Sequence, residues 1–140
     1  MATLKISDLS VGDWVKIKEC AYFPLDKPND FLSPYAKVTA LEDENCIIWL
    51  NTQVGEFCAS LKNIESIPIT AEVLEKNGFE RISQTQPWYR YGADITVAEY
   101  SKGLWGFGIG VPCNAFAYLI GVHSLQHALR LAGVDKEINL

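Results

Sequence analysis

The apolar residues of this chain come in short runs, and this shortness limits its fold more than any other feature. In the first sixty residues, runs of five to seven residues rich in apolar and β-branched side chains alternate with polar or proline-bearing segments. These runs are Trp14–Cys20, Tyr35–Leu41, Cys46–Leu50 and Val54–Cys58. Runs of this length between turn residues are typical of antiparallel strands. We therefore predict a small, curled antiparallel β-sheet or a barrel-like unit for the first half.

The second half begins with a helix signal. Thr70 is a good N-cap residue, Glu72 lies in the first turn, and Gly78 suits a left-handed helix end. This pattern predicts a helix over Ala71–Asn77. The preceding stretch, Leu61–Ile69, is expected to lead out of the first β unit.

A second β region and a final helix follow. Trp88–Tyr91 and Ile95–Tyr100 have the composition and alternation of strands, and Cys113–Ile120 is apolar and β-capable. After that segment, apolar residues recur at helical spacing and predict a helix from about Val122 to Ala132.

Length and composition fit one domain. A chain of 140 residues buries enough surface to need no disulfide or metal, and 49% hydrophobic residues is ordinary for a globular protein. We predict a single compact α+β domain over residues 1–140, with the antiparallel β unit, a connecting helix, a second β region and a C-terminal helix. Residues 1–69 are expected to be mainly β, and residues 70–140 to hold the remaining elements.

Charge and apolar content exclude two classes of partner. The net charge of −5, from 12 basic and 17 acidic residues, does not supply the cationic face that duplex nucleic acid requires. No apolar run approaches the roughly 18 residues of a membrane-spanning helix. The first residues do not resemble a signal peptide, so we expect a cytoplasmic protein.

The four cysteines give no metal or redox motif. Cys20, Cys46, Cys58 and Cys113 are too far apart in sequence to form a Cys-x-x-Cys pair. We expect reduced, mostly buried thiols, no bound metal and no cofactor.

Three blocks of the sequence are familiar in combination. They are Leu9–Val15 with its Gly-Asp-Trp-Val, Asn63–Thr70 with its Ile-Pro-Ile-Thr, and Val122–Gln126 with its Val-His-Ser-Leu-Gln. In this order they resemble a family of small uncharacterised proteins of gut anaerobes, their phages and their mobile elements. The resemblance implies a phage or mobile-element origin, and therefore the host cytoplasm, and it implies no activity. His127 departs from the asparagine that is common at its position in that family.

The tetrapeptide Trp88–Tyr91 is the first candidate binding segment. In a strand, Trp88 and Arg90 point to one side and Tyr89 and Tyr91 to the other. Aromatic rings stack on bases, and arginine binds phosphates or carboxylates through two nitrogens. One side therefore suits a site while the other joins the core, and the alternative is an ordinary strand with an amphipathic exterior.

A glycine-rich stretch, Lys102–Gly110, is the second candidate. It lacks the third glycine of a dinucleotide fingerprint and the lysine of a phosphate-binding loop, so a hairpin or bulged strand is favoured. Its glycines beside Trp105 and Phe107 could let a planar ligand approach the backbone closely.

The final helix holds the third candidate. His123 and His127 are spaced to share a helix face, but no third metal ligand is predicted nearby. We favour the pair of His123 and Gln126 as a ligand-facing site, with a structural polar pair that fixes the helix as the alternative.

Three functions follow from these candidates. The first is a non-enzymatic small-molecule binder that sequesters a nucleotide-derived immune signal, a sponge against host defence. Its ligand-binding residues would be Trp88, Tyr89, Arg90, Tyr91, Trp105, Phe107, Arg81, His123, Gln126 and Arg130. The second is a protein-interaction module, an inhibitor or adaptor that uses the β unit and the loop Pro24–Pro34 to bind a host protein. The third is a nucleotide-cleaving enzyme with His123 or His127 as general base. Homo-oligomerisation is left open.

Overall fold

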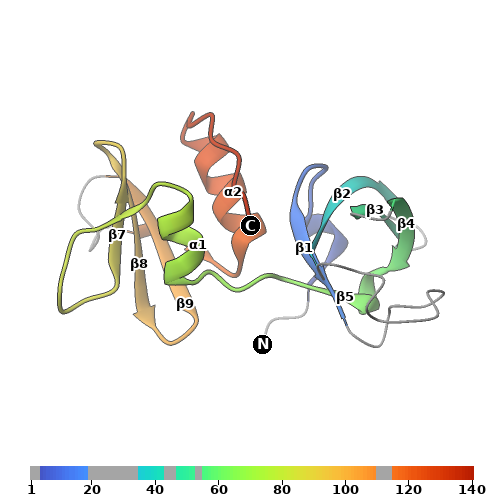
Figure 1. The fold of residues 1–140 in the computed structure, drawn as a ribbon, viewed down its shortest axis with the longest axis horizontal. Helices are drawn as coiled ribbons and strands as arrows, with labels where there is room; N and C mark the ends of the chain where they lie inside the picture. The colour runs from blue at the N-terminus through green and yellow to red at the C-terminus, as the bar shows by residue number, and fades with distance from the viewer. Residues whose placement is uncertain (1–3, 19–34, 43–46, 53–54, 110–114) are drawn as a thin grey trace. The chain divides into compact units, whose positions relative to one another are not determined.

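The computed structural model describes residues 4–18, 35–42, 47–52, 55–109 and 115–140 (Figure 1). The chain divides into two compact units, Met1–Ile67 and Pro68–Leu140. The loop Pro24–Pro34 and three of the cysteines, Cys20, Cys46 and Cys113, lie outside the described residues.

The first unit is an antiparallel sheet. Its strands are β1 (Trp14–Ile17), β2 (Tyr35–Glu42), β3 (Ile47–Thr52), β4 (Gly55–Ser60) and β5 (Ile64–Glu65), with 3₁₀ turns at Ile6–Asp8 and Leu61–Asn63. The strand order is β4-β3-β2-β1-β5, so the chain returns to place β5 beside β1. The sheet is not closed into a barrel. The curled open sheet is therefore the form that this unit takes.

Alternation along these strands builds the core of the first unit. Val15 and Ile17 on β1 are buried, and Val15 lies opposite Ala36 while Val38 lies opposite Leu50. Asp13, at the turn before β1, is also fully buried, and its Oδ2 accepts a hydrogen bond of 2.7 Å from the Ser10 amide. The buried carboxylate thus fixes the turn that starts the sheet.

The second unit places a five-stranded sheet between two helices in sequence. Its elements are α1 (Ala71–Lys76), β6 (Glu80–Arg81), β7 (Trp88–Tyr91), β8 (Ile95–Ser101), β9 (Leu104–Ile109), β10 (Ala115–Leu119) and α2 (Val122–Leu131). The strands form an antiparallel meander in the order β10-β9-β8-β7-β6. Helix α1 packs against β6 and helix α2 against β10, and both helices lie on the same side of the sheet (Figure 1).

Local signals explain both helices. The Thr70 hydroxyl accepts a hydrogen bond of 3.2 Å from the Val73 amide, and Gly78 ends α1 with φ +85°. At α2, the Ser124 hydroxyl accepts from the Gly121 amide at 3.1 Å and donates to the Gly121 carbonyl at 2.8 Å. Neither helix in the described residues is long and apolar enough to span a membrane.

The predicted α+β fold is confirmed, with three local corrections. Ile64–Glu65 forms the edge strand β5 within the stretch Leu61–Ile69, to which the sequence analysis assigned no element, because a two-residue strand is too short to show alternation. The first helix ends one residue earlier than predicted, with Asn77 as its C-cap. Cys58 is an exposed free thiol, because its register opposite Trp49 puts it on the solvent side of β4.

Candidate functional site

Strand β7 divides the aromatic tetrapeptide between two faces of the second sheet, as its alternation predicts. Tyr89 is 1% exposed and its ring centroid lies 6.1 Å from that of Trp105. Tyr91 is half-buried, and its ring lies 5.1 Å from Phe79. Arg90 is exposed and Trp88 half-buried. We call the face with Tyr89 the core face and the face with Trp88 the outer face.

The glycine-rich strand β9 follows the same division. Phe107 lies opposite Val97, which lies opposite Tyr89, so Phe107 and Trp105 belong to the core face. Gly106 lies opposite Ala98, which lies opposite Trp88. A planar ligand that approached these glycines would therefore meet Trp88 and not Trp105 or Phe107. Ala98 is fully buried, so solvent reaches the rim of the outer face and not this central row.

The three arginines lie on three different elements, and each has different neighbours. Arg81 donates from Nε to the Ser83 carbonyl at 2.8 Å, which supports the turn before β7. Arg130, in the last turn of α2, forms an ion pair of 3.6 Å with Glu137. Arg90 lies opposite Glu80 on the outer face, whereas Arg81 lies opposite Tyr89. The structure does not bring these guanidinium groups together in one site.

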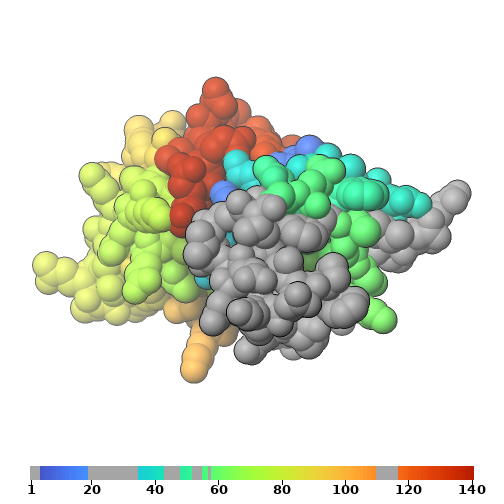
Figure 2. Space-filling model, turned by 45° about the vertical axis from the view of Figure 1, so that its right-hand side comes forward, coloured from blue at the N-terminus to red at the C-terminus, as the bar shows by residue number. Residues whose placement is uncertain are grey.

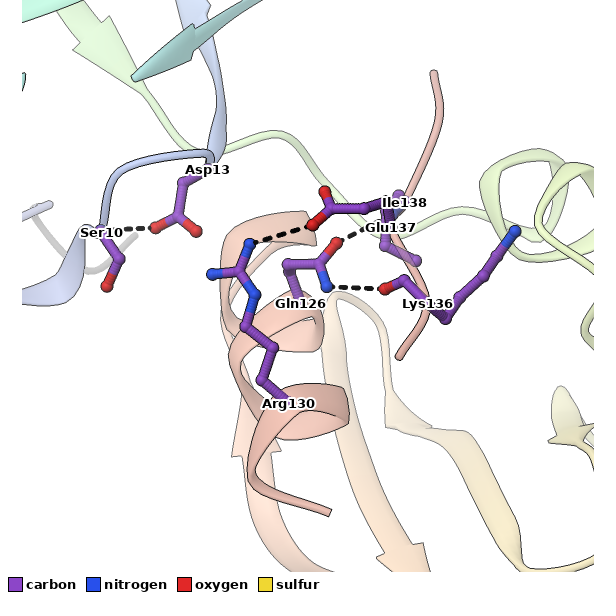
Figure 3. Close-up of polar contacts among 7 residues, drawn as sticks. All are labelled: Ser10, Asp13, Gln126, Arg130, Lys136, Glu137 and Ile138. Atoms are coloured by element: carbon purple, nitrogen blue, oxygen red, sulfur yellow. Dashed lines mark hydrogen bonds and ion pairs between the residues drawn. The ribbon is translucent and has the colours of Figure 1, made fainter. Parts of the chain in front are cut away.

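The candidate residues of α2 are buried. His123 is 1% and Gln126 3% exposed, and the rings of His123 and His127 contact edge to face at 6.1 Å. Gln126 binds the backbone of residues 136 and 138, which gives it a structural task (Figure 3). Among the described residues, no three His, Cys, Asp or Glu side chains are grouped so that they could hold a metal ion.

The structure shows one apolar surface that the sequence analysis did not single out. Where β8 and β10 end and β9 begins, four large side chains are exposed, and we call them the end patch: Tyr100 (43%), Leu104 (41%), Tyr118 (67%) and Ile120 (47%). The rings of Tyr100 and Tyr118 contact edge to face at 6.3 Å. A segment near residue 100 projects from the surface of the molecule (orange, Figure 2). The four residues of the end patch are brought together only by the register between the strands. No sequence motif therefore predicts the patch.

The two edges of the second sheet differ in their protection. Strand β6 has two residues, Glu80 and Arg81, and both are charged and exposed. Strand β10 has five residues, Ala115–Leu119, with no charge among them. In the part of the chain that the structure describes, β10 pairs only with β9.

The chain matches no protein-family model, no curated protein and no solved structure. The resemblance to a family of small proteins of gut anaerobes, their phages and their mobile elements therefore stays a prediction. Any function has to be inferred from the geometry.

Proposed function

We propose that this chain is a protein-interaction module, an adaptor or inhibitor, whose second unit binds an extended segment of its partner along β10. The observation that supports this proposal is the uncharged edge strand β10 beside the exposed end patch. An edge strand offers a row of backbone N–H and C=O groups to which another chain can add a strand.

The contrast with β6 strengthens the proposal. Proteins protect the edges of their sheets with short strands and charged side chains, because unprotected edges associate with other chains. Strand β6 has both protections. Strand β10 has neither of these two protections, although its register with β9 shifts between Ala115 and Ala117. An uncharged edge of this length is explained if a partner covers it.

The end patch indicates which side chains the partner segment should carry. Tyr118 belongs to β10 and is 67% exposed, so a strand added to this edge would place side chains directly beside its ring. Aromatic side chains are the commonest energetic anchors of interfaces. The partner segment should therefore be extended, with apolar side chains on the face that meets Tyr100 and Tyr118.

The nucleotide sponge is a second candidate, and it depends on fewer residues than the sequence suggested. A small-molecule site requires a few polar groups that converge on one concavity. Tyr89, Trp105 and Phe107 are packed in the core, and Gln126 is bonded to backbone. Trp88 and Arg90 share the outer face and remain the part of the set that a base and a phosphate could contact.

The test of the interaction module uses two substitutions of equal chemistry. Tagged parent protein, Tyr118→Lys and Leu131→Lys are used to capture partners from host lysate, and the captured proteins are identified by mass spectrometry. Leu131 is 89% exposed on α2 and serves as the matched control. We expect a partner that the parent and Leu131→Lys retain and Tyr118→Lys loses.

Purified partner should then slow hydrogen exchange in β10 and the end patch of the parent. Equal capture by all three proteins, or protection confined to other strands, would contradict the proposed surface.

A further inference from the structure

Residues 136–139, which we call the strap, are held by two buried side-chain amides. Gln126 donates from Nε2 to the Lys136 carbonyl at 2.7 Å, and its Oε1 accepts from the Ile138 amide at 2.8 Å (Figure 3). Asn77 donates from Nδ2 to the Asn139 carbonyl at 2.7 Å, and its Oδ1 accepts from the Asn139 amide at 2.7 Å. Each carboxamide thus uses one donor and one acceptor on the strap backbone.

This arrangement imitates a neighbouring β-strand. Asn77 exchanges both bonds with a single residue, as a hydrogen-bonded pair does in an antiparallel ladder. Gln126 bonds to the carbonyl and the amide on either side of residue 137, as a neighbour does in a parallel ladder. The two side chains therefore recognise extended backbone, whatever the side chains of the bound segment.

One side chain of the strap adds selectivity. Ile138 is fully buried, whereas its neighbours Glu137 and Asn139 are exposed. The site therefore accepts an extended segment with an aliphatic residue at its centre and polar residues around it. Burial of that aliphatic group is the largest apolar contribution that the strap offers.

Asn77 and Gln126, which together we call the clamp, are held in place by contacts outside the strap. Asn77 caps α1, and its Nδ2 also donates to the Val73 carbonyl at 2.7 Å, which fixes the orientation of the carboxamide. Gln126 is anchored within α2 and is 3% exposed. A site arranged in this way loses little conformational entropy when a segment enters it.

The strap is joined to α2 through a single glycine turn. Gly133 has φ +77°, its amide donates to the Arg130 carbonyl, and the Val134 amide donates to the Leu129 carbonyl. Glycine tolerates other backbone angles at this point, so the strap can leave its own clamp by a change at the turn. Exchange of an identical segment between two copies needs no new contacts.

We propose that Asn77 and Gln126 form a peptide-binding clamp that takes the strap of a second copy of this chain in exchange for its own. The proposal concerns other residues than β10 and the end patch, so it is independent of the proposed function. Because the chain's own strap competes at a high effective concentration, exchange between copies should become visible only near millimolar protein.

The first experiment measures peptide binding to the full chain carrying Ile138→Asp, whose own strap cannot bury its central residue. A fluorescent peptide of residues 133–140 is titrated and followed by anisotropy. We expect the peptide with Ile138 to bind at least tenfold more tightly than its Ile138→Asp form, and a peptide with Asp135→Asn, at an exposed residue outside the strap, to bind like the parent peptide. Equal binding of all three peptides, or none to a protein that circular dichroism shows to be folded, would overturn the proposal.

The second experiment needs no altered strap and covers the case in which Ile138→Asp does not fold. Parent chains with light and heavy isotopes are mixed at about millimolar concentration and examined by native mass spectrometry. The expected result is dimers of mixed isotope composition that excess strap peptide dissociates. A chain with Asp135→Asn, at an exposed residue outside the strap, should form them as well. Monomers alone, or dimers that the peptide leaves intact, would refute strap exchange and, in the latter case, assign association to another surface.

Discussion

The two faces of the second sheet carry similar aromatic residues with opposite environments. On the core face, Tyr89 and Phe107 are at most 1% exposed, whereas Tyr118 is 67% exposed at the end of the outer face. The two helices lie on one side of the sheet and cover the core face (Figure 1), whereas on the outer face Ala98 in the central row is buried and Tyr118 lies at the rim. An aromatic residue near glycines therefore marks a candidate site only when its face is known.

The core face can be tested by removing its central ring. We expect Phe107→Ala to lower the free energy of unfolding by about 3–5 kcal/mol, because it empties space between sheet and helices. Tyr118→Ala, as the matched aromatic truncation on the outer face, should change it by less than about 0.5 kcal/mol. Urea denaturation of both variants measures the two values. Equal losses would show that the outer aromatic is packed as firmly as the core one.

The nucleotide candidate can be tested on the outer face. It predicts that a nucleotide, cyclic dinucleotide or ADP-ribose derivative at a hundred times its dissociation constant stabilises the parent by about 2.7 kcal/mol. Trp88→Ala and Arg90→Ala should abolish that gain in a thermal-shift assay, while Lys102→Ala, an exposed basic residue in the β8–β9 turn, keeps it. A gain that survives both substitutions would remove these residues from any ligand site.

The helices that cover the core face are themselves connected by the strap. We expect Gln126→Ala to lower the free energy of unfolding by about 1–3 kcal/mol, because the Ile138 amide and Lys136 carbonyl lose their partner. Gln84→Ala, at an exposed glutamine in the turn before β7, should be neutral. Thermal unfolding of both variants compares them. A neutral Gln126→Ala would show that Ile138 burial alone holds the strap.

Strand alternation predicted how Trp88 to Tyr91 divide between the faces, because a period of two depends only on the backbone. It could not predict that Gly106 shares the outer face with Trp88, with Ala98 between them, since that depends on the pairing of β7 with β8 and of β8 with β9. The end patch has the same origin. The strap was not predicted from the sequence either. Its backbone is bonded by the side-chain amides of Asn77 and Gln126 and not by a neighbouring strand, and residues 134–140 have no periodic pattern.

The smallest expected effect is that of the exposed ion pair between Arg130 and Glu137, which can be compared with the buried hydrogen bonds of Gln126 to the strap. Arg130 and Glu137 are 3.6 Å apart with side chains 38% and 59% exposed. Exposed ion pairs contribute about 0.2–1 kcal/mol, and salt screens them. A double-mutant cycle of Arg130→Ala and Glu137→Ala should give a coupling energy in that range that falls in high salt, whereas the effect of Gln126→Ala should not depend on salt. A coupling energy as large as the loss of unfolding free energy in Gln126→Ala would contradict this view. It would mean that the ion pair, and not the two carboxamides, contributes most to holding the strap in place.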